Sequence, residues 1–232
     1  MKGRDFDLRG NTSIKYRCLV LDHDDTVVKS TMDIHYPSFS ETIKKLRPNI
    51  NVPSYDEYVS YCFKPGFFEL CKEILKFTKE EQEYQYEVWK RHTKEKAPDF
   101  YPGMAVTLKK YKDLKGIVCV VSHSESSLIK RDYKAHCGFI PELIFGWDVG
   151  DELRKPNPYP IIEIMKKLGL NNDEVLVLDD LKPGLDMARA ANVDFACAGW
   201  SHTVPEIEKY MKDNSDFYFK TVTTFADFIL EI

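Results

Sequence analysis

Cysteine pairing motifs are missing from this chain of 232 residues. No two of its six cysteines stand in CxxC spacing, which argues against both a zinc site and a disulfide framework. Most of them lie in apolar segments, so we interpret them as small core residues of a protein from a reducing compartment. The six are Cys18, Cys62, Cys71, Cys119, Cys137 and Cys197.

Long apolar runs and basic stripes are also absent. Residues 1–9 are short and charged and lead into no long apolar segment, so we expect neither a signal peptide nor a membrane span. With the cysteines, this predicts a cytoplasmic protein. The net charge is −4 and the lysines are spread along the chain, which disfavours a nucleic-acid surface. A small phosphorylated ligand remains possible, because it needs only a few local cations.

The periodicity of the hydrophobic residues predicts an α/β fold. Apolar residues make up 43% of the chain, enough for one large or two modest domains. A first group of four helices, with no strand signal between them, is predicted at residues 35–46, 55–62, 67–77 and 80–96. Helices then alternate with short strands at residues 117–121, 143–145, 175–178, 194–198 and 217–219. Such alternation is typical of a doubly wound parallel sheet, here with an inserted α-helical domain.

Polar groups follow the strands that we expect to be buried. Residues 18–21 run into Asp22, residues 117–121 end at Ser122, and residues 175–178 end at Asp179 and Asp180. A further cation, Lys155, stands before a proline that restricts the backbone. Ligands of parallel α/β sheets bind beyond the carboxyl ends of the strands, so these side chains form a candidate site.

These residues resemble the four ordered motifs of the haloacid dehalogenase (HAD) superfamily. The motifs are Asp22-x-Asp24-x-Thr26, then Ser122, then Lys155-Pro156, then Asp179-Asp180 with Gly184 following. The long gap after the first motif suits a helical cap. The resemblance therefore implies a HAD-like core of residues 1–30 and 100–232 and a cap of residues 31–99, with hinges near residues 29–31 and 99–103.

The resemblance also implies a role for each residue. Asp22 is the nucleophile that forms an aspartyl-phosphate, and Asp24 is the general acid and base. Ser122 donates a hydrogen bond to the phosphoryl group and Lys155 pairs with Asp22. Mg²⁺ is held by Asp22, Asp179, Asp180 and the backbone carbonyl of Asp24, since this ion prefers oxygen ligands.

Charge and two departures from the family pattern bear on this interpretation. Five carboxylates, including Asp25, would face the single cation Lys155, and a divalent ion is the simplest way to offset their repulsion. Asp25 stands where glycine is usual, and it either strengthens metal binding or points away. His23 and His123 are interpreted as packed loop residues without a part in the mechanism.

We therefore predict a Mg²⁺-dependent phosphatase that acts on a small phosphorylated metabolite and resembles the phosphoglycolate phosphatases. Asp24 disfavours dehalogenase and phosphonate chemistry. A mutase similar to β-phosphoglucomutase is an alternative, although residues 51–90 contain no arginine for a second phosphate and only Lys64 offers a substitute. A non-catalytic phosphate-sensing or binding protein of similar fold is another alternative. The oligomeric state is not readable from the sequence.

Overall fold

A six-stranded parallel sheet forms the centre of the computed structural model, which describes residues 13–231. Its order is β5-β4-β1-β6-β7-β8, which confirms the predicted doubly wound sheet. The strands are β1 (Cys18–Leu21), β4 (Ile117–Val121), β5 (Ile144–Phe145), β6 (Val175–Asp179), β7 (Asp194–Ala198) and β8 (Phe217–Phe219). The interpretation of residues 1–9 lies outside the described residues.

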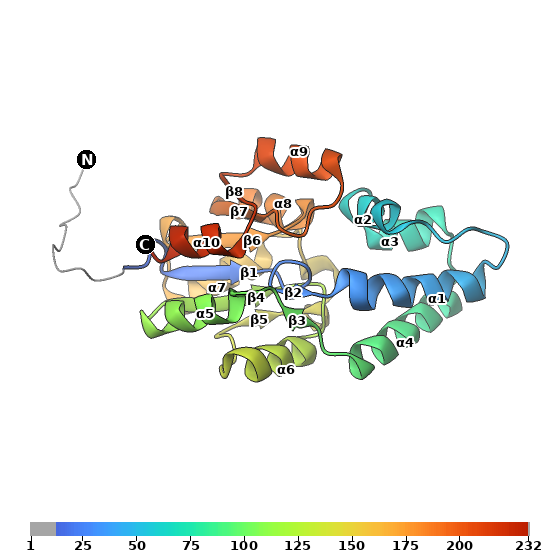
Figure 1. Ribbon diagram of the computed structural model, residues 1–232, viewed down its shortest axis with the longest axis horizontal. Helices are drawn as coiled ribbons and strands as arrows, with labels where there is room; N and C mark the ends of the chain where they lie inside the picture. Colours follow the sequence, from blue (N-terminus) through green and yellow to red (C-terminus); the bar gives the residue numbers. More distant parts are fainter. Residues whose placement is uncertain (1–12, 232) are drawn as a thin grey trace.

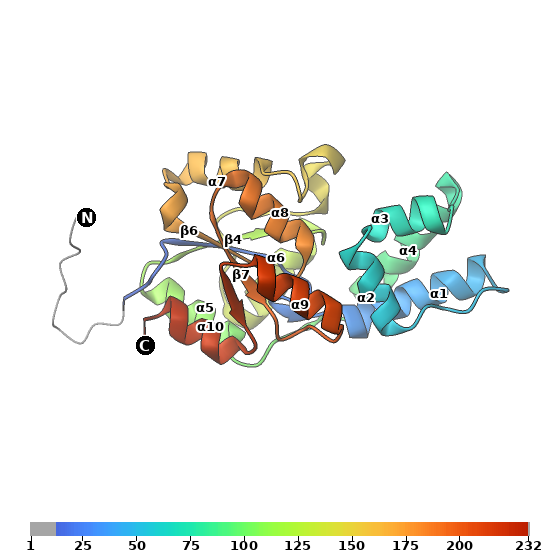
Figure 2. The ribbon, with the colours of Figure 1, turned by 90° about the horizontal axis from the view of Figure 1, so that it is seen from above.

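Helices cover both faces of this sheet, because successive strand residues point to opposite sides. Leu19 and Leu21 pack with α5 (Met104–Asp113), α6 (Ser126–Cys137) and α10 (Val222–Ile229). Val20 packs on the other face, which is covered by α7 (Tyr159–Leu168), α8 (Lys182–Ala191) and α9 (Pro205–Asn214). Figure 2 shows α7 and α8 on one side of the sheet and α5 and α10 on the other.

A group of helices lies beyond the carboxyl ends of the strands (Figure 1). The chain enters it through β2 (Val28–Lys29) and returns through β3 (Asp99–Phe100), and these two strands pair antiparallel. Between them are α1 (Tyr36–Leu46), α2 (Tyr55–Phe63), α3 (Phe67–Glu69) and α4 (Lys79–Glu95), with π-helical turns at Thr31–His35 and Leu70–Ile74. Their shared core contains Phe39, Ile43, Tyr58, Leu70, Cys71 and Phe77. We call these helices the cap.

Capping residues fix where the cap helices begin. The side chain of Ser54 accepts a hydrogen bond from the backbone of Glu57, whose carboxylate bonds back to Ser54. Thr78 and Glu81 form the same reciprocal arrangement at the start of α4. Such capping boxes satisfy backbone N–H groups that have no partner within the helix.

The predicted boundaries need several corrections. The helix expected over residues 67–77 is only a short α-helix followed by a π-helical turn that ends at Ile74. The β2–β3 pair was not predicted, because two-residue strands carry no readable periodicity. α8 begins at Lys182, before the expected residue 184, since Pro183 is well suited to the first turn of a helix. Short 3₁₀ turns are present at Trp147–Val149, Asp151–Leu153 and Asn172–Glu174.

The cysteines agree with their interpretation as core residues. All six are free, and all but Cys62 are buried. Among residues 13–231, no helix is both long and apolar enough to cross a membrane.

Candidate active site

The register of the central strands brings the predicted site residues together. Leu21 of β1 pairs with Leu178 of β6, so the next residues, Asp22 and Asp179, lie side by side at the carboxyl edge of the sheet. Ser122 follows β4, the neighbour of β1 on its other side. Adjacent strands are about 4.8 Å apart, so residues at neighbouring strand ends lie close together.

Lys155 ties two of these strand ends together. Its Nζ donates to Asp22 Oδ1 and to Asp179 Oδ2, each at 2.6 Å, and all three side chains are buried. Burial alone would lower the pKa of Lys155, but the two carboxylates outweigh it and raise that pKa. Lys155 is therefore a permanent cation in the centre of the site.

Three carboxylates form a compact oxygen cluster beside Lys155. Ligand oxygens of Asp22, Asp179 and Asp180 all lie within 4.8 Å of one another, and the three residues are buried. Burial, and next the charge of Asp22, raise the pKa of Asp179 to about 6 against the opposing effect of Lys155. The pKa of Asp180 is raised by burial and by its neighbours. One lysine does not offset three buried carboxylates, and the donor set fits Mg²⁺.

The carboxylate of Asp22 is held on both oxygens. Thr26 Oγ1 donates to Asp22 Oδ2 at 3.1 Å, while Lys155 occupies the other oxygen. Thr26 is fully buried, and its carbonyl accepts a hydrogen bond from the indole of Trp200. This arrangement fixes the direction in which Asp22 presents its oxygens.

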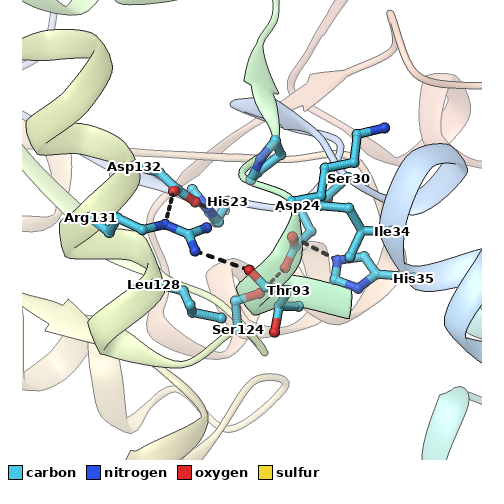
Figure 3. A pocket seen from close by; sticks show the side chains of 12 residues that line it. His23, Asp24, Ser30, Ile34, His35, Thr93, Ser124, Leu128, Arg131 and Asp132 are labelled. Carbon is cyan, nitrogen blue, oxygen red and sulfur yellow. Dashed lines mark hydrogen bonds and ion pairs between the residues drawn. The ribbon is translucent and has the colours of Figure 1, made fainter. Parts of the chain in front are cut away.

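Asp24 lies apart from the carboxylate cluster and faces the cap (Figure 3). His35 Nε2 lies 2.9 Å from Asp24 Oδ1, and Ser124 Oγ donates to Asp24 Oδ2 at 2.6 Å. The indole N–H of Trp89 donates to His35 Nδ1 at 3.0 Å, so this nitrogen accepts and Nε2 carries the proton toward Asp24. The hydroxyl of Ser122 is 3.4 Å from Asp24 Oδ2.

Contacts with His35 and Ser124 set the ionisation of Asp24. Burial alone would raise the pKa of this carboxyl, but the two contacts outweigh burial and lower it. Asp24 is an ionised carboxylate in this arrangement, ready to accept a proton.

Asp25 points away from the carboxylate cluster, which answers the question that its sequence position raised. Its carboxylate accepts hydrogen bonds from the backbone N–H groups of Ser30 at 3.2 Å and Thr31 at 3.1 Å. Its φ of 56° is the left-handed conformation that the usual glycine would adopt readily. Asp25 thus anchors the chain where it enters the cap.

The two histidines left out of the predicted mechanism are packed against the site. His23 is buried against Asp132 of α6. His123 contacts the carbonyl of Lys155, and burial together with the charge of Lys155 lowers its pKa to about 4. His123 is therefore neutral at pH 7.

Sequence reasoning missed His35, Ser124 and Trp89. Ser124 stands two residues after Ser122 in a serine-rich loop, a spacing that offered a weak signal. His35 and Trp89 lie on helices that are far apart in the sequence, and no local pattern joins them to Asp24. Thr26 belonged to the quoted motif, but no role was assigned to it.

Aromatic residues of the cap divide between its own core and the sheet domain. Phe67 packs on Phe39 within the cap. Phe68 stacks on Trp147, with ring centroids 4.9 Å apart, and Phe63 packs edge-on against Tyr210 of α9. A cavity of about 290 Å³ lies between α4 and the loops after β4 and β5, lined by Tyr86, Glu125, Ser126, Ser127, Trp147 and Asp148.

Together, the doubly wound sheet, the inserted helices and the acidic cluster at the strand ends are the features of an α/β hydrolase. Residues 19–198 match the family of haloacid dehalogenase-like hydrolases. The chain belongs to this family.

Solved structures with the same fold cover almost the whole chain. One, from Haemophilus somnus 129pt, is described as a predicted phosphoglycolate phosphatase; it is 20% identical, with a TM-score of 0.71, covering 92% of this chain and 96% of its own. CbbY from Rhodobacter sphaeroides, in complex with phosphate, is 18% identical with a TM-score of 0.71, covering 94% and 100%. A putative β-phosphoglucomutase from Bacteroides vulgatus is 17% identical with a TM-score of 0.69, covering 93% and 88%. No curated protein matches the sequence.

Proposed function

We propose that the protein is a Mg²⁺-dependent phosphatase that hydrolyses a small phosphorylated metabolite through an aspartyl-phosphate on Asp22. The observation that carries this proposal is the buried cluster of Asp22, Asp179 and Asp180 with Lys155 between two of its members. A nucleophilic carboxylate, a fixed cation and a set of oxygen ligands are what phosphoryl transfer requires. Two structures of CbbY, which have a similar fold, are described as complexes with phosphate and with xylulose-(1,5)bisphosphate.

In the first step, an Asp22 oxygen forms a bond to phosphorus while the bond from phosphorus to the leaving oxygen breaks. Lys155 and Thr26 aim the carboxylate, and Ser122 donates a hydrogen bond to a phosphoryl oxygen. Asp24 acts here in its protonated form, which the second step regenerates with a proton from water, and passes that proton to the leaving oxygen. Asp22, Asp179, Asp180 and the carbonyl of Asp24 would hold Mg²⁺, which would supply positive charge to the phosphoryl oxygens.

In the second step, Asp24 takes a proton from the water that attacks phosphorus, and Asp22 is released together with inorganic phosphate. The contacts of Asp24 with His35 and Ser124 favour the ionised carboxylate, which is the form needed to accept this proton. General acid and base catalysis of this kind contributes roughly 10²- to 10⁴-fold in rate.

We further propose that residues 31–99 act as the cap domain over a core of residues 1–30 and 100–232. The ring contacts of Phe63 with Tyr210 and of Phe68 with Trp147 support this proposal, because they join the two sets of residues. Closure of such a domain excludes water during the first step and selects the leaving group. The cavity beside Tyr86 and Trp147 is the space between the two parts.

The test is phosphate release from p-nitrophenyl phosphate and a panel of phosphorylated metabolites, with and without Mg²⁺. We expect metal-dependent turnover that falls by roughly 10⁴-fold or more in Asp22→Asn, because the nucleophile is removed. Asp186→Asn is the matched control, since this half-exposed residue forms an ion pair with Lys182 and, among residues 13–231, with no other side chain. Wild-type protein that releases no phosphate from any compound would contradict the proposal, and isomerisation of sugar phosphates would then test the mutase alternative.

A further inference from the structure

His23 stands between the two aspartates of the first motif, where apolar residues are common in the HAD superfamily. Its side chain is polar and buried. The residue is 1% exposed, and Nε2 lies 3.2 Å from Asp132 Oδ2. The carbonyl of His23 accepts hydrogen bonds from the backbone N–H groups of Val27 and Val28, which lead into the cap. His23 is therefore fixed at both ends, to α6 and to the turn that follows Asp22 and Asp24.

The partner of His23 is itself held by a cation. Asp132 is 2% exposed, and its second oxygen accepts a hydrogen bond from Arg131 Nε at 2.7 Å. A buried carboxylate is costly unless it is paired, and Asp132 uses one oxygen for each partner. The carboxylate therefore joins Arg131 to His23.

The same arginine reaches the end of the cap. Arg131 Nη1 donates to the carbonyl of Thr93 at 3.0 Å, in the last turn of α4 (Figure 3). Carbonyls in the last turn of a helix lack partners within the helix, so Arg131 caps α4 at the point where the chain returns to the core. An unbroken series of contacts thus runs from α4 to the loop after β1, which carries Asp22 and Asp24.

The side chains around these residues leave little free volume. The cavity beside them has a volume of about 10 Å³, room for one water-sized sphere at most. Residues of the core and of the cap line it together, among them His23, Asp24 and Thr93. In this region the cap packs tightly against the loop that carries Asp22 and Asp24.

We propose that Arg131 and Asp132 are positioning residues that transmit the placement of the cap to the loop carrying Asp22 and Asp24. Arg131 contacts the end of α4, and Asp132 links Arg131 to His23. The position of His23 then determines the backbone conformation between Asp22 and Asp24. The kinetic part of this inference rests on the proposed phosphatase function. Its structural part does not.

The variant Arg131→Met tests the inference, because it keeps the aliphatic stem and removes both hydrogen bonds. We expect kcat for p-nitrophenyl phosphate to fall roughly 10- to 10²-fold while KM changes less than about twofold, since misplacement of reacting groups by about 1 Å has effects of this size. Arg131→Lys keeps the charge without the fork of donors and is expected to recover part of kcat. Arg91→Met is the control, because Arg91 lies on α4 but pairs with Glu41 inside the cap.

Amide hydrogen exchange supplies a readout that does not depend on turnover. Exchange over residues 22–29 is expected to speed up in Arg131→Met and to stay at the wild-type rate in Arg91→Met. A loop that exchanges equally in both variants overturns the inference, whatever happens to kcat. If the wild-type protein releases no phosphate, the proposed function fails and the exchange comparison alone decides whether Arg131 positions the loop.

Discussion

The two sides of Asp22 are built in different ways. On one side, Asp179, Asp180 and Lys155 gather at neighbouring strand ends, and opposite charges hold them. On the other side, Asp24 is held by residues from the cap and from the loop after β4, through directed hydrogen bonds. The first side depends on charge and the second on geometry. Substitutions should therefore affect the two sides differently.

The largest effect is expected from Lys155→Met, which breaks the charge balance of the strand-end side. Phosphate release should fall by roughly 10²- to 10³-fold, because a fixed cation beside the transferring group is lost. The free energy of unfolding without metal should drop by about 3–5 kcal/mol, as for other broken buried pairs.

Activity assays and chemical denaturation, with and without Mg²⁺, measure these effects of Lys155→Met. Lys182→Met, which removes a half-exposed cation paired with Asp186, serves as the control. Equal losses in the two variants would show that Lys155 has no special place in the site.

Gly184→Ala should disturb the strand-end side of the site by a steric clash, without a change of charge. A methyl group there would lie 2.2 Å from the Asp179 carboxylate, which Lys155 and the backbone N–H of Leu181 hold in place. Overpacking typically costs about 1–3 kcal/mol, so Mg²⁺ affinity is expected to weaken roughly tenfold. Isothermal titration calorimetry measures it, and unchanged affinity would mean that Asp179 is free to move or does not bind the metal.

The pH dependence of Mg²⁺ binding should show how strongly the strand-end side of the site depends on charge. The pKa of Asp179 is raised to about 6, so below pH 6 this group is protonated and the metal must displace a proton. Affinity should therefore rise by up to about tenfold per pH unit below pH 6, where one proton is displaced, and level off between pH 6 and pH 7. Titrations in two buffers of different ionisation enthalpy count those protons. Affinity that stays constant over this range would exclude Asp179 as a ligand.

The smallest effect is expected from Trp89→Phe on the cap side. It keeps the ring stack on His35 but removes the indole N–H that fixes the His35 tautomer. One hydrogen bond is worth about 1 kcal/mol, so kcat should fall roughly fivefold. Trp200→Phe makes the same chemical change beside Thr26 in the core and should lower stability more than kcat. Steady-state kinetics and thermal unfolding of both variants test this, and equal losses of kcat would contradict the comparison.

The same contrast explains what the sequence predicted and what it did not. The strand-end residues were predictable because β1, β4 and β6 have strong apolar patterns and their register follows from the fold. The partners of Asp24 were not, because His35 and Trp89 meet only through packing of α4 against the first turn of the cap. Helix ends shifted by a few residues where π-helical turns and prolines, which periodicity does not register, decide the boundary.

The β2–β3 pair has a consequence for how this architecture diversifies. Val28 pairs with Phe100 and Lys29 with Asp99, so the polypeptide leaves and re-enters the sheet domain at adjacent points. Segments whose two ends lie close together are readily inserted or replaced. Replacement of the segment between these two strands would change selectivity and remove the cap-side partners of Asp24, while Asp22, Lys155, Asp179 and Asp180 at the edge of the sheet would keep their places.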